Sequence, residues 1–456
     1  MTKEIHRLDA LPKGCIIGIY GCGKRGTVLH SILQQERPDI RVACFIDSFK
    51  SGSFLGLDTI QVDNVEKIDS LCEHILIAST FAQEILHALP PELKEKTHIP
   101  LHGFFQWYGH RSGDTAAYST IHIEANTNCN MRCTFCVSTF LRSFESDKQL
   151  TMETMRDIIQ HISSARIART VSILGERGEP LVYRHLDESL DFIKKQGLGT
   201  SMITNGLLLD HTVFQRLEGR LDSLVISLHN LSDTSFRIRG IKSSYDAYLK
   251  GISRFLRAHS ETQSNMTVVV KVMLAFPDWP ASQMYDVAAI LDDTRNLQTV
   301  FPNFARKLNQ ELNTDHMQLS ISPEDLNWTR ERMAKGQHIT EFPMGNNVTF
   351  AFVPIQSSMY SDLRHIDPAL YNKFNLVFPG DRPCSLGDPA IDIDGNVSLC
   401  CIHDAEIRLG NIYDDHASLH DMVTGEKAES MMRDFSLDQL PYKVCKLCRA
   451  NYSIKE

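Results

Sequence analysis

Three cysteines within eight residues constrain this chain more than any other feature of its sequence. The segment NTNCNMRCTFCVS, residues 126–138, places Cys129, Cys133 and Cys136 in the spacing C-x3-C-x2-C, directly after an alternating strand predicted over residues 120–124. A [4Fe–4S] cube normally takes four thiolates, and a structural zinc site is closed by four ligands. The loop therefore predicts a metal centre with one ligand missing, rather than incidental cysteines or an incomplete zinc site.

The bulk composition is that of an ordinary globular protein of about three domains. The chain has 456 residues, 42% of them hydrophobic and 23% charged, and no apolar run long enough to span a membrane. Its start, MTKEIHRLDALPKG, lacks the apolar segment of a signal peptide, which predicts a cytoplasmic protein. A net charge of −9 argues against a nucleic-acid partner.

The twelve cysteines are unevenly distributed. A reducing cytoplasm disfavours disulfides, so the early scattered cysteines are expected to be small buried hydrophobes: Cys15, Cys22, Cys44 and Cys72. Five more lie near the end of the chain, and none lies between Cys136 and Cys384. The two later groups are therefore treated as separate centres.

The N-terminal region alternates predicted buried strands with helices. The strand CIIGIY runs into the turn GCGKRG and a helix, and further strands are expected at VACFID and HILIAS. Gly21, Gly23 and Gly26 fit the pattern G-x-G-x-x-G, and Asp47 lies where a dinucleotide fold places its ribose-binding carboxylate. These features predict a Rossmann-like parallel sheet over residues 1–105. It resembles the short modules at the front of sugar-modifying and polysaccharide-cluster proteins. The region has only about half the length of a full dinucleotide domain, so binding of NAD(H) or another nucleotide and a purely structural turn both stay open.

After a linker expected over residues 106–118, the loop CNMRCTFC resembles the signature of the radical S-adenosylmethionine (SAM) superfamily, with Phe135 before the third cysteine. The resemblance implies that SAM binds the open iron of a [4Fe–4S] cluster. It also implies a one-electron reductant, flavodoxin or ferredoxin, and cleavage of SAM to a 5′-deoxyadenosyl radical that abstracts hydrogen from the substrate.

Further sequence motifs of this family follow successive predicted strands. ERGEP resembles the G-G-E-P motif with Arg177 in place of the first glycine, and RIRG resembles the R-x-R-G segment. TNG and the serine of ISLHN follow the family pattern at two intervening strands. The resemblance implies that SAM is contacted by Gly178, Glu179, Asn205, Ser227, Arg237 and Arg239.

The strands MTVVVKVMLAF and VTFAFVP complete the central region, with a polar helical insertion from about Trp279 to Gly345 between them. Six strand–helix units predict a partial (β/α)6 TIM barrel over residues 119–360, whose chemistry gathers at the C-terminal ends of the strands. The fold class is therefore α/β, with a small cysteine-rich domain following the barrel.

The tail holds a second set of thiols, Cys384, Cys400, Cys445 and Cys448, and a hairpin is expected at Asp394-Gly395-Asn396. Four thiolates suit either a closed [4Fe–4S] cube or a zinc ion. The pattern C-x10-G-x4-C followed by C-x2-C resembles the SPASM/Twitch domain of radical SAM enzymes. This resemblance implies one auxiliary [4Fe–4S] cluster over residues 361–456. It leaves Cys401 as a spare thiol: an alternative ligand, a redox residue or a buried neighbour of the cluster.

The class of substrate is predicted from weaker sequence features. An N-terminal Rossmann-like domain favours oxidation or other modification of a small sugar-like molecule: a carbohydrate, an aminocyclitol or a nucleotide-linked sugar. The auxiliary cluster would accept the second electron. No cysteine of the barrel region lies outside the loop, which disfavours epimerisation by a thiol hydrogen donor and favours an oxidation or a redox-neutral elimination. His229 and Lys271 are candidate general bases, and no catalytic residue is assigned.

Two alternatives from other classes stay open. The protein could modify a peptide or protein side chain, as enzymes of ribosomal-peptide (RiPP) or sulfatase maturation do. It could also be a non-catalytic iron–sulfur or zinc protein, which an open three-cysteine site disfavours.

Overall fold

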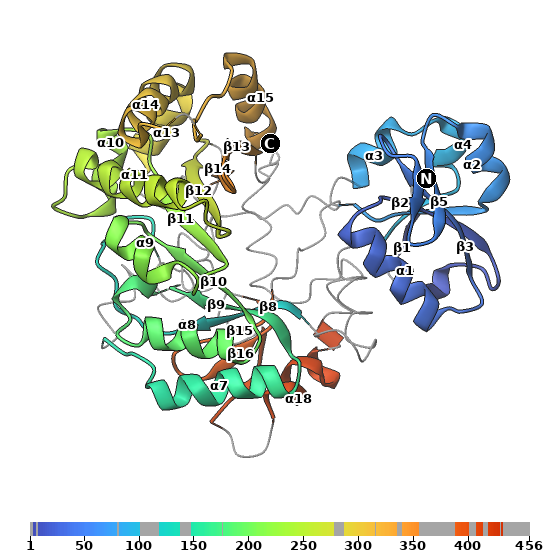
Figure 1. Ribbon diagram of the computed structural model, residues 1–456, viewed down its shortest axis with the longest axis horizontal. Coiled ribbons are helices and arrows are strands. Elements are labelled where there is room, and N and C mark those ends of the chain that lie inside the picture. Colours follow the sequence, from blue (N-terminus) through green and yellow to red (C-terminus); the bar gives the residue numbers. More distant parts are fainter. Residues whose placement is uncertain are drawn as a thin grey trace. The chain divides into compact units, whose positions relative to one another are not determined.

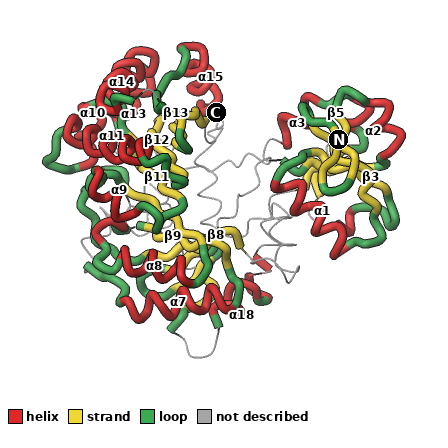
Figure 2. The backbone as a smooth tube through the Cα atoms, in the orientation of Figure 1, coloured by secondary structure: helices red, strands yellow, loops and turns green. Residues whose placement is uncertain are grey.

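The computed structural model describes residues 3–5, 8–79, 82–100, 118–136, 147–175, 177–277, 287–314, 316–334, 340–354, 388–400, 407–413, 418–428 and 430–431. The chain divides into two compact units, formed mainly by Met1–Tyr118 and by Ser119–Gly380 with Gly387–Gly425. Figure 2 shows that each unit combines helices with strands. Each is described by itself.

Unit 1 is built on a seven-stranded sheet in the order β1-β7-β6-β2-β3-β5-β4. All its strand pairs are parallel except β4–β5. The strands are β1 (Lys3–Ile5), β2 (Ile16–Tyr20), β3 (Arg41–Asp47), β4 (Gly52–Phe54), β5 (Leu57–Gln61), β6 (His74–Ile77) and β7 (Thr97–Pro100). The helices are a 3-10 turn at Leu8–Ala10, α1 (Lys24–Glu36), α2 (Val65–Leu71), α3 (Ala82–Ala88) and α4 (Pro91–Lys94).

The core of unit 1 explains why its strands read as apolar runs. Strands covered by helices on both faces bury nearly every side chain, and Ile17, Ile19 and Phe45 have no exposed surface. The expected burial of the early cysteines is confirmed for Cys15, Cys22, Cys44 and Cys72. The parallel sheet predicted for this region is present, with the antiparallel strand β4 as an addition that the sequence pattern did not predict.

Unit 2 is built on a ten-stranded sheet in the order β13-β14-β12-β11-β10-β9-β8-β15-β16-β17. The strands are β8 (Tyr118–Glu124), β9 (Ala168–Leu174), β10 (Gly199–Thr204), β11 (Ser223–His229), β12 (Thr267–Leu274), β13 (Thr340–Gly345), β14 (Val348–Pro354), β15 (Ala390–Ile391), β16 (Asn396–Ser398) and β17 (Arg408–Asn411). The series β8, β9, β10, β11, β12 and β14 supplies the six strands expected for the partial barrel.

Helices cover one face of this sheet (Figure 1). They are α7 (Met152–Ser164), α8 (Leu186–Lys195), α9 (His211–Leu217), α10 (Asp233–Phe236), α11 (Tyr245–Glu261), α13 (Ala288–Arg295), α14 (Leu297–Leu312), α15 (Pro323–Ala334) and α18 (Leu419–Thr424), with 3-10 turns at Pro180–Val182 and Arg237–Arg239. The Thr151 hydroxyl caps α7 and the Ser244 hydroxyl caps α11, each by accepting a backbone N–H. These caps fix where the covering helices begin.

The insertion between β12 and β14 differs in part from the expectation. It holds helices α13, α14 and α15, but it also supplies β13, which pairs antiparallel with β14 at the edge of the sheet. The alternation of Thr340–Gly345 is interrupted by a proline and a glycine, which explains why the strand is hard to recognise.

The predicted hairpin around residues 394–396 is present as β15 and β16. It does not stand apart from the barrel, because β15 pairs in parallel with β8 through Ala390–His122 and Ile391–Ile123. The sheet of the barrel therefore continues into the C-terminal region.

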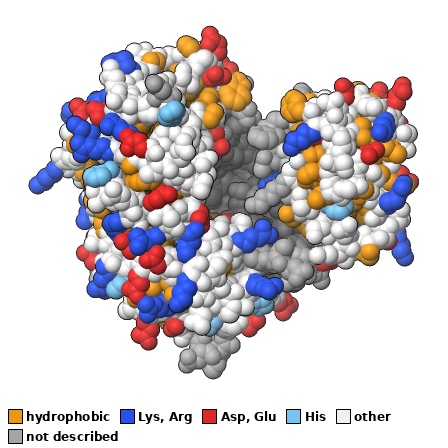
Figure 3. Space-filling model, in the orientation of Figure 1, with side chains coloured by type: hydrophobic (Ala, Val, Ile, Leu, Met, Phe, Trp, Pro, Cys, Tyr) orange, Lys and Arg blue, Asp and Glu red, His pale blue; other side chains and the backbone are white. Residues whose placement is uncertain are grey.

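Within the described ranges, none of the helices combines the length and apolar character that a bilayer crossing demands. On the face drawn in Figure 3, basic and acidic side chains are interspersed over unit 2.

Candidate active site

The cysteine loop leaves the end of β8 and is held by backbone hydrogen bonds to a second segment of unit 2. The amide of Arg132 donates to the carbonyl of Arg239 at 3.0 Å, and the amide of Thr134 donates to the carbonyl of Ile238 at 2.9 Å. The loop closes on itself where the amide of Cys136 donates to the carbonyl of Cys133 at 3.2 Å. The motif R-x-R-G is therefore the backbone support of the cysteine loop.

The three thiols of the loop lie within electrostatic reach of one another. Burial raises the pKa of Cys133 to about 11, the Arg239 charge opposes this, and the thiols of Cys136 and Cys129 raise it further. The side-chain amide of Asn205 lies 3.6 Å from Sγ of Cys129. No three His, Cys, Asp or Glu side chains among the described residues are arranged to hold one metal ion.

Arg239 is the cation of this site. Its side chain is 1% exposed, and its guanidinium nitrogens lie near Sδ of Met131 at 3.1 Å, Nδ1 of His229 at 2.9 Å and the carbonyl of Asn205 at 2.9 Å. These partners carry no charge, and a buried charge is costly unless it is paired. Burial would lower the pKa of Arg239, but the thiol of Cys133, the hydroxyl of Tyr248 and the thiols of Cys129 and Cys136 together raise it. Thiolates at the three cysteines of the loop would supply the negative charge that this buried cation requires.

Arg237 lies differently, although it is only two residues away. Its side chain is 79% exposed and pairs with Asp233 at 3.1 Å. The two arginines of the motif thus occupy opposite environments: one is enclosed beside the cysteine loop and the other is on the surface.

Glu179 is buried at the end of the segment that follows β9. Its carboxylate accepts hydrogen bonds from the Thr204 hydroxyl at 2.6 Å and from the amides of Asn205 at 2.8 Å and Leu181 at 3.1 Å. Burial raises the pKa of Glu179, and these hydrogen bonds oppose the rise. The carboxylate thereby ties the β9 loop to the end of β10.

Gly178 is required by a close backbone approach. A Cβ added there would lie 2.0 Å from Oδ1 of Asn126, and the amide of Glu179 donates to the carbonyl of Asn128 at 2.7 Å. The segment GEP therefore packs directly against the start of the cysteine loop. Glu176 lies outside the described residues.

The sequence interpretation missed the role of Glu124, the last residue of β8. Its carboxylate has no exposed surface and accepts hydrogen bonds from the amide and the guanidinium of Arg177. The departure from G-G-E-P at Arg177 was the only available signal, because an arginine in that place calls for a carboxylate partner.

Ser227, His229 and Lys271 come from the adjacent strands β11 and β12. His229 has a left-handed backbone with φ of 65°, next to an irregularity in the pairing of β11 with β12. A guanidinium only donates, so Nδ1 of His229 accepts from Arg239 and the neutral ring carries its proton on Nε2. Burial, followed by the charges of Arg239 and Lys271, holds the pKa of His229 well below its ordinary range. The His229 ring also contacts Phe135, with centroids 5.8 Å apart.

The glycine turn of unit 1 is stabilised from within. The carboxylate of Asp47 accepts from the amides of Cys22 at 3.2 Å, Phe49 at 3.0 Å and Lys50 at 3.1 Å. These hydrogen bonds lower the pKa of Asp47 although burial alone would raise it. Asp47 thus organises the turn, and nucleotide binding at Gly21, Gly23 and Gly26 stays a prediction.

Of the C-terminal cysteines, Cys400 is described and half-buried just after β16. Cys384, Cys401, Cys445 and Cys448 lie outside the described residues.

Family models match both cysteine groups. The radical SAM superfamily model matches residues 123–288, and the model of the SPASM iron–sulfur cluster-binding domain matches residues 384–449.

Curated relatives are similar over parts of their length. A probable GTP 3′,8-cyclase of Thermococcus kodakarensis is 32% identical over 152 residues, which cover 33% of this chain and 48% of that protein. An Fe-coproporphyrin III synthase of Methanosarcina barkeri is 28% identical over 125 residues, covering 27% of this chain and 30% of that protein. The chain therefore spans less than half the length of these relatives. A structure of Streptococcus suis SuiB bound to S-adenosylmethionine is 12% identical, with a TM-score of 0.42 and coverage of 82% of each chain.

The two family matches confirm the predicted cofactors, SAM with an iron–sulfur cluster at the barrel and auxiliary iron–sulfur binding at the tail. They coincide with the cysteine loop on the barrel sheet and with the late cysteines of the sequence. The chain is a member of the radical SAM superfamily with a C-terminal SPASM domain.

Proposed function

We propose that this radical SAM enzyme oxidises a small hydroxyl-bearing substrate: a carbohydrate, an aminocyclitol or a nucleotide-linked sugar. The observation that carries the proposal is the absence of any cysteine between Cys136 and Cys384. Without a thiol in the barrel to return a hydrogen atom, the substrate radical left by hydrogen abstraction would lose an electron to the auxiliary cluster and the proton of its hydroxyl group, so that the alcohol becomes a carbonyl. A relative named as a probable GTP 3′,8-cyclase supports a nucleotide-bearing molecule within this class.

We infer that Cys129, Cys133 and Cys136 hold the [4Fe–4S] cluster, and that Gly178, Glu179, Asn205 and Ser227 line the SAM site with Arg239 behind them. The cluster and SAM, when bound, supply a 5′-deoxyadenosyl radical. The exposed pairing of Arg237 with Asp233 favours Arg239 as the arginine of this site.

His229 is unsuited to act as the base of an alcohol oxidation through Nδ1, because Arg239 already donates to that nitrogen. Its place is to orient Arg239, with the ring packed on Phe135. The proton acceptor of the reaction is not assigned to a residue.

Anaerobic reconstitution tests the proposal. Two cubes predict about eight irons per chain, and SAM with a reductant should give 5′-deoxyadenosine. A panel of sugars, aminocyclitols and nucleotide-linked sugars is then offered, each with deuterium at the carbon that bears the hydroxyl. Oxidation predicts deuterium in 5′-deoxyadenosine and one SAM consumed per product.

Three results would contradict parts of the proposal separately. Absence of 5′-deoxyadenosine from fully loaded protein contradicts the radical chemistry. A product of unchanged oxidation state indicates elimination or cyclisation instead. Turnover of peptides in a parallel panel, with none of the small molecules accepted, contradicts the substrate class.

A further inference from the structure

The register of the sheet separates a helix-covered face from an inward face. Phe350 and Phe352 of β14 pack against Phe301 of α14, with ring centroids 5.8 and 5.6 Å apart. Val270 and Val272 are the register partners of Phe350 and Phe352 on β12, and they are fully buried. Lys271 lies between these valines, so strand alternation places its side chain on the opposite face, away from the helices.

A row of register partners crosses this inward face. Lys271 pairs with Ser227 of β11 on one side and with Ala351 of β14 on the other, and Ala351 pairs with Glu341 of β13. Direct register partners share a face of the sheet. A serine, a lysine and a small alanine therefore adjoin one another, and the alanine leaves the lysine without a bulky neighbour on that strand.

Lys271 is half-buried, and no acceptor among the described residues lies within hydrogen-bonding distance of its ammonium group. Burial lowers the pKa of Lys271, and within the described part of the chain the carboxylate that opposes this shift belongs to Glu341. Glu341 is exposed and lies two strands away across Ala351. A partly desolvated ammonium is costly without an anionic partner, and the described residues place none in direct contact with Lys271 on this face.

The row begins beside the cysteine loop. Thr204 is the register partner of Ile226, so the next residues, Asn205 and Ser227, lie at the following level of the sheet. Asn205 contacts Sγ of Cys129, and the charge of Lys271 reaches His229, whose ring contacts Phe135 of the loop. The lysine thus lies one strand beyond the residues that approach the SAM site.

We propose that Lys271, which lies beside Ser227 of the SAM site, binds an anionic oxygen group of the substrate. This inference rests on the proposed function and narrows it, because it requires a substrate that carries a phosphate or a carboxylate. A lysine ammonium is a compact point charge with three donors, which suits either group. The anchored anion sets the distance between the reacting carbon and the SAM site.

Binding of two probe anions to the reconstituted enzyme with SAM bound tests the assignment and separates the two sources. Inorganic pyrophosphate represents the phosphate of a nucleotide-linked sugar, and glucuronate represents a carboxylate. Titration calorimetry compares the wild type with Lys271→Met, Lys271→Arg and the control Lys250→Met, which removes an exposed lysine of α11. Loss of a charged hydrogen bond predicts a Kd about tenfold or more higher in Lys271→Met for the favoured anion. Lys271→Arg should retain much of the affinity, and Lys250→Met all of it.

A second measurement requires no variant. Acetylation of the wild-type enzyme by acetic anhydride, followed by mass spectrometry, should show Lys271 protected by the bound anion and Lys250 unprotected. Equal affinity of the wild type and Lys271→Met, or no protection of Lys271 by either anion, overturns the inference.

The two proposals fail differently. Wild-type enzyme that forms 5′-deoxyadenosine but binds neither anion overturns the role of Lys271 and leaves the radical chemistry standing. Enzyme that binds pyrophosphate through Lys271 but never forms 5′-deoxyadenosine overturns the proposed reaction and leaves the anion site standing.

Discussion

Glu124 and Arg177 form a buried ion pair that joins three parts of unit 2. The Glu124 carboxylate accepts from the Arg177 amide at 3.0 Å and from Nε of its guanidinium at 3.0 and 3.1 Å. It also accepts from the amide of Ile393, in the turn between β15 and β16, at 3.3 Å. One carboxylate therefore holds the loop that contains Glu179 and the hairpin of the C-terminal region.

Replacing Glu124 by alanine should strongly destabilise unit 2. Removing one partner of a buried pair leaves an uncompensated charge and lowers the free energy of unfolding by about 3 kcal/mol or more. Urea unfolding followed by circular dichroism measures this change. SAM affinity should fall as well, because Arg177 precedes Gly178 and Glu179.

The control is Glu188→Ala, which removes the partner of Arg156 from an ion pair whose two side chains are each 50% exposed. Exposed pairs contribute less than about 1 kcal/mol. Equal decreases in the free energy of unfolding of the two variants would show that burial does not increase the contribution of Glu124 to stability.

The two arginines of the motif R-x-R-G should respond very differently to substitution. Arg239→Met removes the buried cation beside the three thiols and leaves the Asn205 carbonyl with one donor fewer. The reconstituted iron content should fall from about eight toward about four per chain, since only the auxiliary cube is unaffected. Arg237→Met should retain full iron and change stability by under about 0.5 kcal/mol, because that side chain is 79% exposed. Iron loss in the Arg237 variant alone would reverse the assignment.

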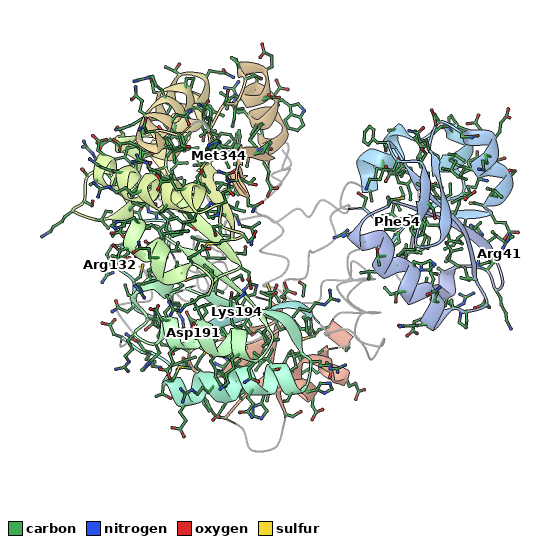
Figure 4. The ribbon with its side chains drawn as sticks, viewed as in Figure 1. Arg41, Phe54, Arg132, Asp191, Lys194 and Met344 are labelled. Atoms are coloured by element: carbon green, nitrogen blue, oxygen red, sulfur yellow. The ribbon has the colours of Figure 1, made fainter. Side chains whose placement is uncertain are left out.

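Asp222 should make stability depend on acidic pH. Burial raises the pKa of Asp222, but hydrogen bonds from Lys194 and Thr200 lower it by more. The net pKa therefore lies below its ordinary value. Lys194 belongs to α8 and is labelled in Figure 4. The stability that Asp222 contributes is present above its unfolded pKa and is lost as the pH falls through the lower folded pKa.

Asp222→Asn should therefore lower the free energy of unfolding of the metal-free protein by about 1 kcal/mol at pH 6, a modest value because the carboxylate is half exposed. The difference from the wild type should shrink as the pH falls through the lowered pKa of Asp222 and vanish once the carboxylate is protonated in both the folded and the unfolded state. Urea titrations across this range measure it, and a difference that persists unchanged in acid would exclude the carboxylate as its source.

The glycine turn of unit 1 offers a matched pair of substitutions. A Cβ at Gly26 would lie 2.0 Å from the carbonyl oxygen of Gly21, whereas a Cβ at Gly23 meets nothing within 4 Å. Gly26→Ala should displace α1 and lower the free energy of unfolding of unit 1 by about 2 kcal/mol. Gly23→Ala should change it by less than about 1 kcal/mol. If both alanines were tolerated, the close approach of α1 to the turn would be refuted.

The sequence predicted the barrel well because its strands are long apolar runs between amphipathic helices. The runs at SLVISLHN, MTVVVKVMLAF and VTFAFVP correspond to β11, β12 and β14. Short strands were missed: β1 and β4 have three residues each, and segments of that length carry no readable period.

The site was predictable where chemistry is local and not where it depends on distant partners. The cysteine loop and Glu179 follow from contiguous motifs. The partner of Arg177 is 53 residues away, and no local pattern identifies it. The sequence could not choose between Arg237 and Arg239 because a 3-10 turn, Arg237–Arg239, directs its two ends into different surroundings.

The continuous sheet of unit 2 makes the C-terminal region hard to remove. The amide of His122 on β8 donates to the carbonyl of Pro389 at 2.8 Å, and β15 then completes the pairing of that strand. A chain ended before residue 388 would expose the main-chain N–H and C=O groups along this side of β8, and such an open edge invites pairing with other molecules. Shortened versions of this protein should therefore aggregate rather than yield a soluble barrel, so the tail serves the barrel as a protective cover as well as a metal-binding domain.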